Sequence, residues 1–123
     1  MEGQDQWRRT RVVKIESMES WNFYLTKAIQ QDSLIVVHFT ASWCMPSVAM
    51  NPFFEELALT YPDVLFLTVD VDEVKEVAAK LEIKAMPTFL MMKNGTQIDK
   101  LVGANPEEIR KRIGAYTETV HVA

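Results

Sequence analysis

The residues with the clearest capacity for chemistry in this sequence are Cys44, which is the only cysteine, and Ser47, which follows three positions later. The apolar run at residues 34–40 is typical of a buried strand, and residues 46–59 have helical spacing. The thiol is therefore expected at a strand-to-helix turn near a helix N-terminus, where unpaired backbone N–H groups favour a thiolate. A thiolate in such a position can attack a disulfide bond.

The elements that must position this turn can be placed from hydrophobic periodicity and turn residues. The order is β-α-β-α-β-α-β-β-α, which predicts one α/β domain with a mixed sheet of five strands flanked by four helices. We expect strands at 11–15, 34–40, 64–69, 88–92 and 97–102, and helices at 18–28, 46–59, 72–81 and from 105 to the region of Tyr116.

Five positions predict how these elements begin, bend or turn. Ser17 and Asn105 are expected to cap the first and last helices. Asp72 is expected to cap the helix that ends at Leu81, and Pro52 is expected to kink the helix in which it lies. Asn94-Gly95 between two apolar runs predicts a β-hairpin.

The amino-acid composition narrows the classes of protein to which this chain can belong. The 123 residues fit one domain, 1–123, with residues 1–10 as a flexible extension that contains Trp7. A net charge of −4 without a basic block argues against nucleic acid as a partner. The polar, acidic start and the absence of a long apolar run predict a cytoplasmic protein without a membrane partner. One cysteine and two histidines without ligand spacing predict no metal site.

Several segments together resemble the thioredoxin family, and most closely the h-type thioredoxins of plants. The resemblance runs from about residue 11 to residue 117, and it implies a thioredoxin fold. The Trp-Cys-x-Pro turn combined with a downstream Met-Pro-Thr is a specific combination. The matching segments are 36–44, 52–57, 69–73, 85–89, 93–95 and 102–104.

Departures from the family pattern indicate a subgroup. The family's turn reads Trp-Cys-Gly-Pro-Cys-Lys, whereas this chain has Ser47 and Val48 at the last two positions. The family's buried aspartate is His38, and its partner lysine on the next strand is Thr68. In the family, that aspartate helps to deprotonate the second cysteine. Losing these groups together is chemically coherent, and the chain resembles a natural single-cysteine, Cys-x-x-Ser subgroup of plant thioredoxin-like proteins.

The resemblance implies roles for individual residues. Cys44 is the expected nucleophile, and Ser47 is expected to support the thiolate by donating its hydroxyl hydrogen. Pro87 is expected to follow a cis peptide bond and to place the backbone of Met86 beside Cys44, where an extended client segment can pair with it. His38 is expected to be a neutral core histidine, hydrogen-bonded to Thr68. The predicted substrate-binding residues are Trp43, Met45, Pro46, Met86, Pro87 and Gly103.

A single thiol predicts a particular kind of exchange. It can open a foreign disulfide, but Ser47 cannot resolve the mixed disulfide, so dithiol reduction by this chain alone is excluded. The expected function is disulfide isomerisation or glutathione-dependent exchange through Cys44, with no cofactor and with glutathione as the co-substrate of the second route. The partners are then disulfide-containing proteins, and a monomer is expected. The alternative is a non-catalytic module that binds clients as a scaffold.

Overall fold

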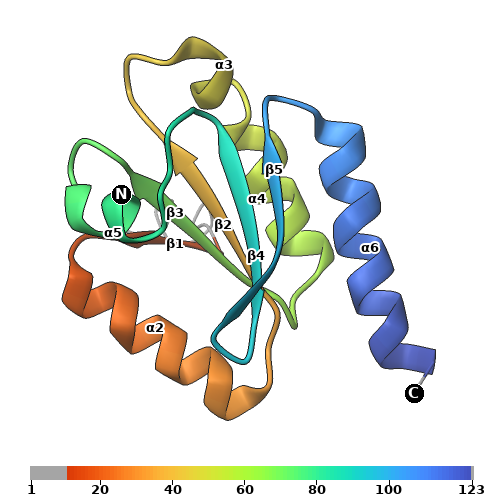
Figure 1. Cartoon of the computed structure of the whole chain (residues 1–123). Coiled ribbons are helices and arrows are strands. Elements are labelled where there is room, and N and C mark those ends of the chain that lie inside the picture. Colours follow the sequence, from red (N-terminus) through yellow and green to blue (C-terminus); the bar gives the residue numbers. More distant parts are fainter. Residues whose placement is uncertain (1–10, 123) are drawn as a thin grey trace, which may run out of the picture.

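The structure, a computed structural model, describes residues 11–122, and the side chains of residues 11–117 (Figure 1). Five strands in this range form one sheet in the order β1-β3-β2-β4-β5. The strands are β1 (Val12–Ile15), β2 (Ile35–Thr40), β3 (Leu65–Asp70), β4 (Thr88–Lys93) and β5 (Thr96–Val102). The helical segments are α2 (Met18–Gln31), α3 (Met45–Val48), α4 (Asn51–Thr60), α5 (Lys75–Lys80) and α6 (Pro106–Val122).

The sheet is mixed, as the element order predicts. β1, β3 and β2 run parallel, because helical segments carry the chain back between them, whereas β4 and β5 are antiparallel additions. The predicted thioredoxin fold with a five-stranded mixed sheet is confirmed. Asn94 and Gly95 have φ values of 54° and 78°, which is the left-handed pair that a tight hairpin turn requires.

The central strand β2 has an apolar sequence because helices cover both of its faces. Successive side chains of a strand point to opposite faces. Ile35 and Val37 pack with the core that includes Trp21 of α2. Val36 packs in the opposite core, which includes Phe54 of α4 and residues of α6. The strand that leads to the thiol is therefore held firmly on both sides.

The predicted helix from 46 to 59 is divided in the structure. α3 ends at Val48, and α4 begins at Asn51 with Pro52 in its first turn. The predicted kink within a continuous helix is therefore wrong in detail. Pro52 has no N–H to donate to the carbonyl four residues earlier, so it is better tolerated at the start of a helix than inside one.

Two of the three predicted helix caps are confirmed. The hydroxyl of Ser17 accepts a hydrogen bond from the backbone N–H of Ser20 at 3.1 Å. The side-chain amide oxygen of Asn105 accepts a hydrogen bond from the backbone N–H of Glu108 at 3.2 Å. The predicted cap at Asp72 is wrong: Val74 is the residue before α5, and its side chain makes no cap hydrogen bond. Asp70 instead accepts the N–H of Asp72 at 2.8 Å, which stabilises the turn before α5.

Candidate functional site

Cys44 lies between the end of β2 and the start of α3, as the sequence predicts. Its backbone N–H donates to the carbonyl of Ala41, and its carbonyl accepts from the N–H groups of Ser47 and Val48, all at 3.0 Å. Cys44 is the N-cap residue of α3, and its side chain makes no capping hydrogen bond. The thiol is free and half-buried, so it is held in a defined position and remains open to a partner.

The loop before β4 supplies the other side of the thiol environment. The peptide bond between Met86 and Pro87 is cis, as expected, and Pro87 is buried. The Cys44 thiol donates to the carbonyl oxygen of Met86 at 3.5 Å. The N–H of Gly103 donates to the carbonyl of Pro87 at 2.9 Å, which connects this loop to the end of β5. Cys44, Met86, Pro87 and Gly103 are thus brought together, and their part in client binding stays a prediction.

Exposed apolar side chains flank the thiol. Trp43 is 63% exposed and Met45 is 68% exposed, and Val102, beside Gly103, is also exposed. The indole N–H of Trp43 donates to a carboxylate oxygen of Asp72 at 2.7 Å, so the ring is oriented although it faces solvent. Pro46 is exposed as well. No local pattern indicates this partner of Trp43, because Asp72 lies 29 positions away.

Ser47 is fully buried, and its hydroxyl is turned towards the sheet. It donates to the hydroxyl oxygen of Thr40 at 2.6 Å. Its oxygen also lies 3.2 Å from Nε2 of His38. Because the hydroxyl has one hydrogen, which goes to Thr40, Nε2 of His38 is the donor in this second contact. The expected donation from Ser47 to the thiolate stays a prediction that requires this hydroxyl to turn.

His38 has different partners from those the sequence predicts. The hydroxyl of Thr68 donates to the backbone carbonyl of His38 at 3.3 Å and not to the ring. The ring instead contacts Ser47 and stacks on Phe89, with a centroid distance of 4.5 Å. Nδ1 is buried without a hydrogen-bond partner within the part of the chain that the structure describes. Burial lowers the pKa of His38 from 6.5 to about 4, which is the direction that the sequence predicts for a neutral ring.

A serine next to a histidine raises the question of a serine nucleophile. The 3.2 Å contact between Ser47 and His38 has a suitable length for proton transfer. Both side chains, however, are fully buried, so no substrate reaches the hydroxyl in this structure. The pair is better explained as a structural contact beneath the thiol turn.

A cavity of about 340 Å³ adjoins the far side of this turn. Val48 and Thr68 line it at the two positions where the family pattern has lysines, and Thr40 lines it as well. Thr40 therefore links the cavity to the buried Ser47. Thr40 was missed from the sequence, although the alternation of a strand puts positions 38 and 40 on one face. The lining residues are Lys14, Thr40, Ser42, Val48, Asn51, Thr68 and Asp70.

Two further features are absent from the part of the chain that the structure describes. Within residues 11–122, no group of three or more His, Cys, Asp or Glu side chains is placed to hold a metal ion. No helix in the same range is both long and apolar enough to cross a membrane.

Comparison with known proteins settles the family. Residues 12–115 match the family model described as thioredoxin. This chain belongs to the thioredoxin family. Members of the thioredoxin family act on disulfide substrates, and this chain has a single cysteine.

Two plant proteins are among the relatives of this thioredoxin-family chain. It is 64% identical over 116 residues to the "Thioredoxin-like protein CXXS1" of Arabidopsis thaliana, covering 92% of this chain and 98% of the relative. It is 48% identical to the protein of the same name from Oryza sativa subsp. japonica, covering 92% of this chain and 85% of the relative. The predicted membership of a single-cysteine subgroup is confirmed.

Solved structures agree with the fold. A poplar thioredoxin h mutant superposes with a TM-score of 0.86 at 40% identity, covering 89% of this chain and 85% of that chain. Thioredoxin NaTrxh from Nicotiana alata superposes with a TM-score of 0.81 at 38% identity, covering 85% of this chain and 90% of that one.

Proposed function

We propose that this chain is a monothiol exchange protein in which Cys44 isomerises disulfides of other proteins or exchanges them with glutathione. The observation that carries the proposal is the position of the Cys44 sulfur. It is half-buried at the start of α3 and lies 3.5 Å from the Met86 carbonyl, and the chain has no second cysteine. We further propose that it acts as a monomer in the cytoplasm, where thiols are kept reduced.

The isomerase route needs no external oxidant or reductant. The Cys44 thiolate attacks one sulfur of a client disulfide, so a Cys44–client disulfide forms and a client thiolate leaves. Another client thiolate then attacks the client sulfur of this mixed disulfide, and Cys44 leaves as a thiolate. One client disulfide is broken and one is formed, so the client's bonding changes while its redox state does not.

The glutathione route uses the same first step. A glutathione thiolate attacks the mixed disulfide at the Cys44 sulfur, which releases the client as a thiolate and leaves glutathione on Cys44. A second glutathione thiolate attacks the glutathione sulfur, releasing Cys44 and oxidised glutathione. The two electrons that reduce the client disulfide come from the two glutathione molecules, which compensates for the missing resolving cysteine.

A specific observation favours a second candidate function. Trp43 and Met45, the chain neighbours of Cys44, expose apolar surface beside the thiol, and such surface can hold a client segment without a covalent bond. The flexible thioether of Met45 suits varied partners. In this alternative, the protein is a client-binding scaffold and the thiol is incidental.

The Cys44→Ser variant separates the two candidates. We expect the native chain to refold scrambled ribonuclease and the variant to lose that activity almost completely. Glutathione dependence of the native rate distinguishes the two exchange routes. Met45→Leu serves as the matched control, because it keeps apolar bulk beside an intact thiol. If the Cys44→Ser variant keeps full refolding activity, the proposed exchange function is wrong. If the variant is inactive but still retains clients in a pull-down, the protein also binds clients without a covalent bond.

A further inference from the structure

Two helices of this protein begin with the same arrangement, in which a serine follows the N-cap residue by three positions. At α2 the pair is Ser17 and Ser20, and at α3 it is Cys44 and Ser47. In α2, the hydroxyl of Ser20 reaches back to the N-cap, where it accepts the backbone N–H of Ser17 at 3.1 Å. It also lies 3.4 Å from the side-chain oxygen of Ser17. A serine at this helical position can thus reach the N-cap side chain.

The corresponding serine of α3 points elsewhere. Ser47 donates to Thr40 at 2.6 Å and accepts from His38 at 3.2 Å, beneath the turn. His38 and Thr40 project from the same face of β2, and His38 is itself held by stacking on Phe89. Thr40 therefore takes the only hydrogen of this hydroxyl, and His38 donates to its oxygen, so the two contacts together fix the orientation of the hydroxyl.

We infer that His38 and Thr40 are positioning residues that hold the Ser47 hydroxyl away from the Cys44 sulfur and so limit the fraction of Cys44 present as thiolate. A hydroxyl donor stabilises the anion more than the neutral thiol, because hydrogen bonds to charged groups are the stronger ones. Withholding the donor leaves a thiol that donates instead to the Met86 carbonyl.

This arrangement suits a protein with one thiol. A sulfur that is poorly stabilised as an anion is a stronger nucleophile per thiolate and a slower leaving group. The mixed disulfide then persists until an external thiol arrives. This consequence rests on the proposed exchange function, whereas the effect on the thiolate fraction does not.

The test measures thiolate in the isolated protein, by absorbance at 240 nm at pH 6. Thr40→Val removes the acceptor of the Ser47 hydrogen, and His38→Phe removes the second partner while keeping an aromatic ring against Phe89. We expect the double variant to raise the thiolate fraction about three- to ten-fold, the size that corresponds to a typical net hydrogen bond. Thr40→Val alone should raise it about two-fold, and this isosteric variant carries the test if the double variant does not fold.

A third substitution distinguishes positioning from a general disturbance. Adding Ser47→Ala to either variant should abolish the increase, because the donor is then missing. Thr68→Val is the matched control: this hydroxyl bonds the His38 backbone and not Ser47, so the thiolate fraction should not change. The inference is overturned if folded Thr40→Val leaves the absorbance unchanged, or if the increase survives Ser47→Ala. Because no client takes part, the result is independent of the ribonuclease experiment.

Discussion

His38 illustrates how position alters the chemistry of one side chain. In the family pattern this place holds an aspartate, which would be a negative charge beneath the turn. Here the side chain is fully buried, stacked on Phe89 and bonded to Ser47, and burial lowers the pKa of His38 to about 4. The ring is therefore uncharged at neutral pH, and the turn has a hydrogen-bonding partner without a charge.

The lowered pKa of His38 makes stability depend on pH. Between pH 6.5 and about 4, the unfolded chain binds a proton that the folded chain does not. The free energy of unfolding therefore falls as the pH falls through this window, and the full contribution is present above pH 6.5. We expect a loss of about 2–3 kcal/mol between pH 7 and pH 4.5 from this group.

Urea unfolding at several pH values measures this dependence. His38→Phe should remove the part of the pH dependence that belongs to this window, since no group at that position then titrates. A native protein whose stability is constant from pH 7 to pH 4.5, or a His38→Phe variant with an unchanged slope, would contradict the assignment.

At the same scale, the sequence was informative about Cys44 and incomplete about its surroundings. The position of the thiol followed from local signals, because a strand, a cysteine and a helix start lie within one stretch of chain. The Met86 loop followed from the family resemblance. The contact between Trp43 and Asp72 could not be predicted, since it depends on how two distant loops approach each other.

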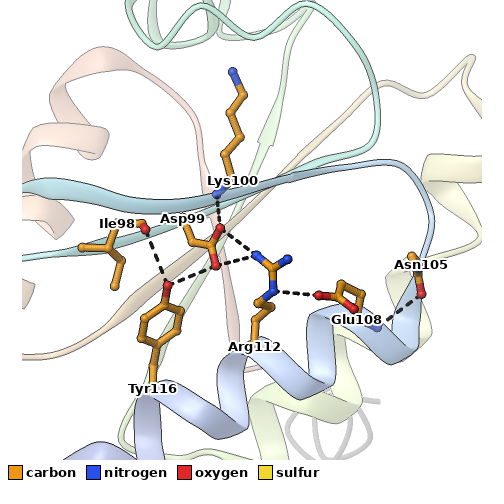
Figure 2. A network of polar contacts seen from close by, with 7 residues as sticks. All are labelled: Ile98, Asp99, Lys100, Asn105, Glu108, Arg112 and Tyr116. Atoms are coloured by element: carbon orange, nitrogen blue, oxygen red, sulfur yellow. Dashed lines mark hydrogen bonds and ion pairs between the residues drawn. The ribbon is translucent and has the colours of Figure 1, made fainter.

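Among the elements, β5 and α6 are joined by a polar network (Figure 2). Arg112 donates to both carboxylate oxygens of Asp99, at 2.8 and 2.7 Å, and to Glu108 at 2.7 Å. Tyr116 donates to Asp99 at 3.0 Å. Burial alone would raise the pKa of Asp99, but the hydrogen bonds from Arg112, the backbone of Lys100 and Tyr116 outweigh it, so this pKa lies below its ordinary value.

Removing the centre of this network should loosen α6. We expect Arg112→Ala to lower the melting temperature by about 2–5 °C, because the contact of Arg112 with both carboxylate oxygens of Asp99 is lost and Asp99 keeps fewer hydrogen-bond partners. Differential scanning calorimetry measures the change. Lys111→Ala is the matched control, since Lys111 is an exposed residue of the same helix. Equal melting temperatures for the two variants would show that the network does not stabilise this helix.

The elements were predicted well where hydrophobic periodicity decides them. β2 was recognisable because both of its faces are buried, and the hairpin because Asn94 and Gly95 adopt positive φ. The break between α3 and α4 could not be recognised from the sequence, because apolar spacing continues through it. Hydrogen bonding decides that point: Met50 donates to the carbonyl three residues earlier, and Pro52 cannot donate at all.

In the molecule as a whole, the fold retains the residues that would serve attack on a disulfide and lacks those that would release the mixed disulfide. The buried strand, the start of α3 and the Met86 loop hold one sulfur in place. Beneath it, a serine and a neutral histidine occupy the places where the family has a second thiol and an acid. The molecule should therefore form mixed disulfides through Cys44 and resolve them only when an external thiol is supplied.

The lifetime of a glutathione adduct on Cys44 tests whether an external thiol is needed to resolve it. We expect oxidised glutathione to add one glutathione to Cys44, and the adduct to remain after free glutathione is removed, because the Ser47 hydroxyl cannot displace a thiolate from sulfur. In the Ser47→Cys variant, the introduced thiol can attack Cys44, so the adduct should give way to an internal disulfide. Mass spectrometry of the intact protein over time distinguishes the two. A native adduct that disappears without added thiol would mean that another group in the chain completes the cycle.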